Sequence, residues 1–135
     1  GFKRCLYPIQ KFSSDTERIL AVILENDRED LKWVKPARGQ FQIHYRFERA
    51  EHQYEPDFVV ETETAKFILE PKQASQIDED RVQAKAAAAR GWCQAATDHA
   101  RQFGGKPWCY VLIPHDAIQE NMTLKGLVRA FGTAR

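Results

Sequence analysis

The sequence contains no long hydrophobic run and almost no methionine. None of its apolar stretches approaches the roughly 18 residues needed to cross a bilayer, so a membrane-spanning segment is excluded. The chain begins Gly1-Phe2-Lys3-Arg4, without an initiator methionine or an apolar signal segment, and its only methionine is Met122. We therefore expect these 135 residues to be part of a longer polypeptide, with no membrane partner.

Cysteine is scarce and shows no pairing pattern. Cys5, Cys93 and Cys109 are odd in number and widely spaced, so they match neither a disulfide framework nor a zinc site. This favours a reducing, cytoplasmic compartment. The four histidines share no metal-ligand spacing, and no glycine-rich phosphate loop is present, so we expect any ATP-using part to lie elsewhere.

The composition is that of one folded domain, which we place at residues 1–135. Hydrophobic residues make up 43% of the chain and charged residues 29%, and no linker or repeat interrupts it. The net charge is only +1, but acidic residues dominate positions 57–80 and basic residues dominate positions 81–135. An acidic site beside a basic surface suits a metal centre that acts on a polyanion, although ordinary surfaces show the same pattern.

Hydrophobic periodicity predicts a central mixed sheet flanked by helices, an α/β or mixed α+β fold. The element order is α-β-β-β-α-β-α, and we expect a parallel crossover around the long second helix. A capping box, Ser14-x-x-Glu17, marks the first helix, and Asp78 is the expected cap of the second. The predicted helices are 14–30, 78–103 and 123–131, and the predicted strands are 41–47, 57–61, 66–70 and 108–113.

The second and third predicted strands form a hairpin that gathers charged residues. If the turn is centred between Glu63 and Thr64, Asp57 lies opposite Glu70 and Lys72 shares their face of the sheet. Two carboxylates about 5 Å apart repel each other by on the order of 3 kcal/mol, so positive charge is needed beside them. Oxygen ligands without histidine favour Mg²⁺, with Mn²⁺ as a substitute, and this chemistry suits phosphodiester hydrolysis.

An ordinary ion pair is the alternative interpretation of Glu70 and Lys72. Such pairs on an exposed sheet contribute about 0–1 kcal/mol. The apolar run from Phe67 to Leu69 instead indicates a buried strand, which favours a functional role for the charged residues that follow it.

Pro56-Asp57 followed by Glu70-x-Lys72 resembles the signature of the PD-(D/E)xK nuclease superfamily. Longer segments are similar to the C-terminal endonuclease domain of type III restriction-enzyme Res subunits and related helicase-nuclease proteins: Tyr54-x-Pro56-Asp57-Phe58-Val59-Val60, Glu70-Pro71-Lys72, Gln83-Ala84-Lys85-Ala86 and Gly105-Lys106-Pro107-Trp108. The resemblance covers residues 14–127. It implies a restriction-endonuclease-like core and a Mg²⁺-dependent DNA endonuclease of a restriction or helicase-nuclease system. It also implies a helicase or translocase region in the same polypeptide and a second nuclease copy for double-strand cutting.

The same resemblance assigns roles to individual residues. Asp57 and Glu70 are implied metal ligands, Lys72 is the implied catalytic lysine, and the main-chain carbonyl of Pro71 is a further ligand. Glu17 matches a metal-binding glutamate found on the first helix of some members, although a helix cap explains it equally well.

Three residues of the second helix are weaker candidates for DNA binding. Gln83 matches a glutamine that some relatives place beside the site, and Arg81 and Lys85 are possible phosphate contacts, although solvated helix residues look the same. Two other functions stay open: a non-cleaving DNA-binding or docking module on this fold, and a structure-specific nuclease resembling junction resolvases.

Overall fold

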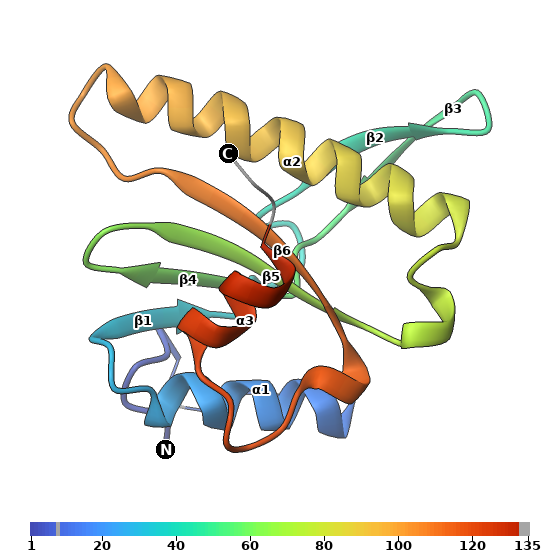
Figure 1. Ribbon diagram of the computed structural model, residues 1–135. Helices are drawn as coiled ribbons and strands as arrows, with labels where there is room; N and C mark the ends of the chain where they lie inside the picture. Colours follow the sequence, from blue (N-terminus) through green and yellow to red (C-terminus); the bar gives the residue numbers. More distant parts are fainter. Residues whose placement is uncertain (8, 133–135) are drawn as a thin grey trace.

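A computed structural model describes residues 1–7 and 9–132. It has α+β architecture, with helices on both faces of a mixed sheet (Figure 1). The elements are α1 (Asp15–Asn26), β1 (Leu31–Val34), β2 (Ile43–Phe47), β3 (Ala50–Tyr54), β4 (Phe58–Thr62), β5 (Lys66–Lys72), α2 (Asp80–Arg101), β6 (Trp108–Pro114) and α3 (Leu124–Phe131), with short 3-10 turns at Ala74–Gln76 and His115–Ala117.

The main sheet has four strands in the order β1-β4-β5-β6. Strands β1, β4 and β5 are antiparallel neighbours, whereas β5 and β6 run parallel because α2 carries the chain back between them. The expected crossover is therefore confirmed. In Figure 1, α1 and α2 lie on opposite sides of this sheet.

Each face of the sheet has its own hydrophobic core. One core joins α1 and α3 to the sheet through fully buried residues such as Leu20, Phe58 and Leu127. The other core joins α2 to β5 and β6, and Ala86 and Ala89 of α2 are both fully buried in it. Their small side chains let the helix axis approach the strands closely. Because the apolar side chains of β5 alternate between the cores, Glu70 faces the same side as α2.

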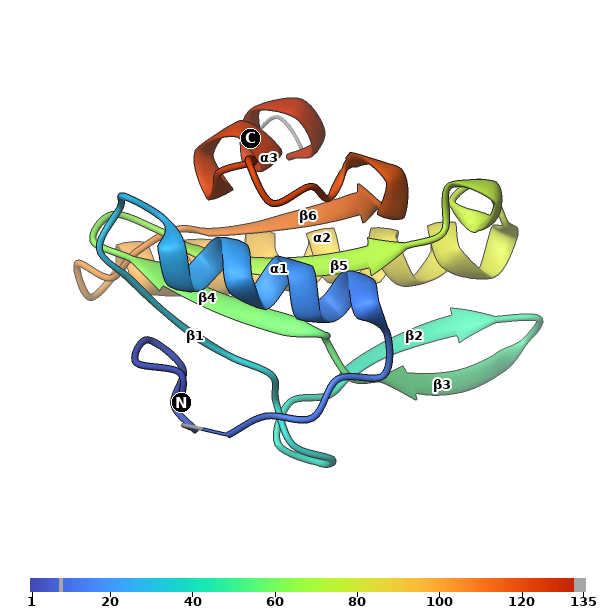
Figure 2. The same cartoon turned by 90° about the horizontal axis from the view of Figure 1, so that it is seen from below.

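Strands β2 and β3 form a separate two-stranded sheet, which corrects the predicted order. Residues 41–47 were expected to add a strand to the main sheet, but among the described residues β2 pairs only with β3, and β1 supplies the fourth strand of the main sheet. The order is thus α-β-β-β-β-β-α-β-α. Strand β1 has only four residues, too few for alternation to show, and β3 is mostly polar and exposed. The β2–β3 hairpin projects past the sheet beside the first half of α2 (Figure 2).

Two predicted helix boundaries are also wrong. Helix α1 ends at Asn26 and not at Asp30, because Asp27 leaves the helix and its buried carboxylate accepts a hydrogen bond from Leu124 N at 2.8 Å. Asp78 does not cap α2, since Glu79 occupies the cap position without a side-chain hydrogen bond. No helix in the described part of the chain has the length and hydrophobicity that a bilayer crossing requires.

Candidate functional site

The β4–β5 hairpin brings the predicted carboxylates together. Its pairing runs from Glu61 opposite Lys66 to Phe58 opposite Leu69, which is the register predicted from a turn centred between residues 63 and 64. Asp57 and Glu70 are the next residues beyond the last pair of this ladder. Both line a cavity of about 290 Å³. The other lining residues are Tyr54, Glu55, Pro71, Lys72, Val82, Lys85 and Leu112.

Pro71 is tolerated because of where it lies in β5. The strand is central in the sheet, so the proline is not on an edge, but pairing with β4 ends at Leu69 while pairing with β6 continues to Lys72. A proline near a strand end leaves few ladder hydrogen bonds unmade. Pro71 itself lines the cavity.

The two oxygens of the Glu70 carboxylate have different surroundings. Tyr110 donates its hydroxyl hydrogen to Glu70 Oε2 at 3.0 Å, whereas Glu70 Oε1 is buried and has no hydrogen-bond partner among the described residues. Burial and the negative charge of Asp57 raise the pKa of Glu70 to about 8, against the weaker opposing effects of Tyr110, Lys85 and Lys72. Positive charges of the described residues therefore offset the charge of this carboxyl group only in part.

Asp57 is similarly perturbed. Burial raises the pKa of its carboxyl group to about 6; Lys35 opposes this rise and the nearby charge of Glu17 adds to it. Lys72 and Lys85 also favour the ionised form. Both carboxyl groups thus resist ionisation. A cation bound between them would favour their ionised forms.

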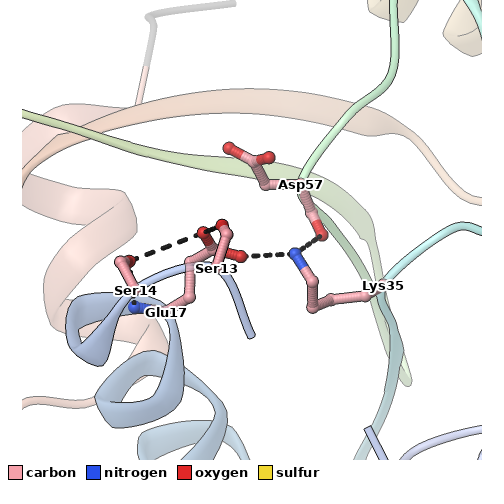
Figure 3. Close-up of polar contacts among 5 residues, drawn as sticks. All are labelled: Ser13, Ser14, Glu17, Lys35 and Asp57. Carbon is pink, nitrogen blue, oxygen red and sulfur yellow. Dashed lines mark hydrogen bonds and ion pairs between the residues drawn. The ribbon is translucent and has the colours of Figure 1, made fainter. Parts of the chain in front are cut away.

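Glu17 is neither a simple cap nor a lining residue of the cavity. Ser14 is the N-cap, as predicted, and its hydroxyl oxygen accepts from Glu17 N at 3.2 Å. The Glu17 carboxylate accepts from the Ser13 hydroxyl and from Lys35 Nζ, the latter at 2.5 Å (Figure 3). Burial favours its protonated form, but these hydrogen bonds dominate and lower the pKa of Glu17.

Lys35 was not identified from the sequence. It follows β1 directly, and its Nζ also donates to the main-chain oxygen of Asp57 at 3.4 Å. In Figure 3 this ammonium lies between Glu17 and the Asp57 carbonyl, while the Asp57 carboxylate points away from it. The only signal in the sequence was a lysine between a short apolar segment and Pro36. Tyr110 was missed too, since its strand was interpreted only as core.

The three α2 candidates have different surroundings. Lys85 lines the cavity, and its Nζ lies 5.8 and 5.7 Å from the ring centroids of Tyr45 and Tyr54. Arg81 is exposed and lies over the ring of Phe47. Gln83 is exposed and donates to Ile77 O at 2.7 Å, and it is not among the described residues that line the cavity. Contact with DNA remains a prediction for all three.

No protein-family model matches the chain, and no curated protein matches it. The resemblance to PD-(D/E)xK nucleases therefore rests on the motif residues of the sequence and stays a prediction.

The residues of the cavity fit a hard divalent cation. Within residues 1–7 and 9–132, no three histidine, cysteine, aspartate or glutamate side chains are grouped as a ready metal site. Two carboxylates nevertheless line the same cavity and interact electrostatically, and one of their oxygens, Glu70 Oε1, is buried without a hydrogen-bond partner among these residues. Both carboxylates offer oxygen ligands. This donor set suits Mg²⁺ or Mn²⁺ with water completing the coordination.

Proposed function

We propose that this chain is a Mg²⁺-dependent DNA endonuclease domain with a restriction-endonuclease-like core. The observation that carries the proposal is the hairpin register, which brings Asp57, Glu70 and Lys72 around one cavity. A purely structural role gives no reason for two carboxylates with raised pKa to share a cavity. The motif resemblance adds the substrate, DNA, and a motor region in the same polypeptide.

The roles that the motif resemblance assigns are compatible with these positions. Asp57, Glu70 and the carbonyl of Pro71 would hold the ion, which when bound supplies Lewis-acid activation of a phosphoryl oxygen and acidification of water. Lys72 would orient the attacking water by hydrogen bonding and offset negative charge developing on the phosphate. Lys85, also in the lining, adds a second positive charge that attracts the phosphate backbone.

A plasmid-nicking assay with Mg²⁺ tests this function. We expect nicking by the wild type and a loss of about 100-fold or more in Asp57→Ala and Lys72→Ala, because each removes a group that contacts the ion or the reacting phosphate. Glu63→Gln, in the β4–β5 turn outside the cavity, is the matched control and is expected to retain activity. Equal nicking by all four proteins contradicts the site.

Two other outcomes separate the alternatives. DNA binding without nicking and without Mn²⁺ binding supports a non-cleaving module. Preferential cutting of a four-way junction over linear duplex supports a resolvase-like nuclease.

A further inference from the structure

The ion pair between Lys35 and Glu17 is well shielded from solvent. The two side chains are only 16% and 10% exposed, and their charged atoms are 2.5 Å apart. The ammonium also contacts the Asp57 carbonyl oxygen and lies 4.8 Å from the centre of the Phe58 ring. Lys35 is therefore anchored from both α1 and β4, by groups that are negative or electron-rich.

This arrangement has a consequence for any ion that uses Glu17. The carboxylate has one oxygen on Lys35 and the other on Ser13, so neither oxygen is free. A divalent ion at Glu17 would have to displace the ammonium and leave a shielded lysine without its counter-charge. Breaking a buried ion pair in this way is strongly unfavourable.

We infer that Lys35 takes the place of a second divalent ion, so that the site binds one ion between Asp57 and Glu70 and Glu17 is not a ligand. The inference rests on the proposed function, since it assumes that this cavity binds a metal. Some phosphoryl-transfer sites use two metal ions as a clamp on the attacking and leaving oxygens. Here a fixed ammonium, held by Glu17 and the Asp57 carbonyl, supplies positive charge on one side of Asp57.

Lys35→Met tests this by removing the charge and keeping a long apolar side chain. We would titrate Mn²⁺ into the metal-free chain by calorimetry and count bound ions by electron paramagnetic resonance. The wild type is expected to bind one ion. Lys35→Met is expected to bind two, with an affinity for the second ion at least about tenfold higher than that of the wild type. The double variant Lys35→Met/Glu17→Gln is expected to bind one ion again, because the second ion needs the freed carboxylate.

Two controls accompany the titration. Lys35→Arg keeps the positive charge and is expected to bind one ion. Lys32→Met removes an exposed lysine of β1, three residues away, and is also expected to bind one. Circular dichroism checks that each variant is folded. If Lys35→Met is unfolded, Lys35→Gln takes its place.

The number of bound ions distinguishes failure of this inference from failure of the proposed function. Two ions in the wild type, or one ion in every variant, overturns the role of Lys35 while leaving the nuclease proposal intact. No ion in any variant overturns both. One ion in the wild type and two in Lys35→Met supports the inference.

Discussion

Replacing Glu70 with glutamine should stabilise the metal-free protein at alkaline pH. Glutamine has the shape of glutamate, and its side-chain oxygen can still accept from the Tyr110 hydroxyl. Its amide group then occupies the position of Glu70 Oε1, which has no partner among the described residues. Burial raises the pKa of the Tyr54 hydroxyl and the charge of Glu70 adds to this, so Tyr54 lies close to the Glu70 carboxyl group. The substitution thus removes a buried charge without creating a cavity.

The raised pKa sets the size and the pH range of the effect. An ordinary glutamate has a pKa near 4.5, whereas Glu70 in the folded chain has one of about 8. The folded protein therefore binds the proton more tightly, and the free energy of unfolding falls as the pH rises from 4.5 to 8. The full difference corresponds to roughly 5 kcal/mol. Because Glu70 is only partly shielded from solvent, we expect a smaller effect of about 2–4 kcal/mol.

Urea denaturation in EDTA at pH 5 and pH 9 measures this effect. Glu70→Gln is expected to exceed the wild type by about 2–4 kcal/mol at pH 9 and by little at pH 5, where Glu70 is already protonated. Adding Mg²⁺ at pH 9 should stabilise the wild type more than the variant, since the ion needs the carboxylate. Glu63→Gln is the exposed control, with no expected change. An equal gain at both pH values, or none at pH 9, would refute the reasoning.

Two further predictions concern the scaffold. Phe58→Ala removes a ring that is fully buried in the core between α1, α3 and the sheet, and it should lower the free energy of unfolding by about 3–5 kcal/mol in urea denaturation. Phe103→Ala, at a side chain 74% exposed, should change it by less than about 0.5 kcal/mol. Asp27→Ala removes the acceptor for Leu124 N at the start of α3, so the buried N–H loses its partner and the expected loss is about 1–3 kcal/mol. If amide hydrogen exchange, compared with the wild type, speeds up more in α3 than in α2, the effect is located at the start of α3. Unchanged exchange in α3 would contradict the prediction.

The β4–β5 hairpin could be predicted from the sequence because its register depends only on neighbouring residues. A strand pair joined by a short turn has a register set by the turn and by which face is apolar, so Asp57 and Glu70 could be paired by counting. The parallel crossover was predictable for a similar reason, since a long helix between two apolar strands allows few arrangements.

The separate β2–β3 sheet was not predictable in the same way. Strand β3 has the sequence AEHQY, whose polar residues carry little strand signal, and its turn uses Glu48 and Arg49 at positive φ instead of glycine or asparagine. Tertiary contacts determine where this hairpin lies. Its apolar side chains pack in the core beneath α2, where Lys85 contacts the rings of Tyr45 and Tyr54.

The positive charges around the carboxylates were also only partly predictable from the sequence. Lys72 belongs to the hairpin and was found by spacing, but Lys35 and Lys85 reach the site from the end of β1 and from α2. No rule of sequence separation connects either lysine to Asp57. A sequence motif can therefore identify the carboxylates that attract a metal ion. The lysines that compete with the ion for those carboxylates are known only from the fold. For this reason the Glu70 substitution tests what the sequence already implied, and the Lys35 substitution tests what only the structure reveals.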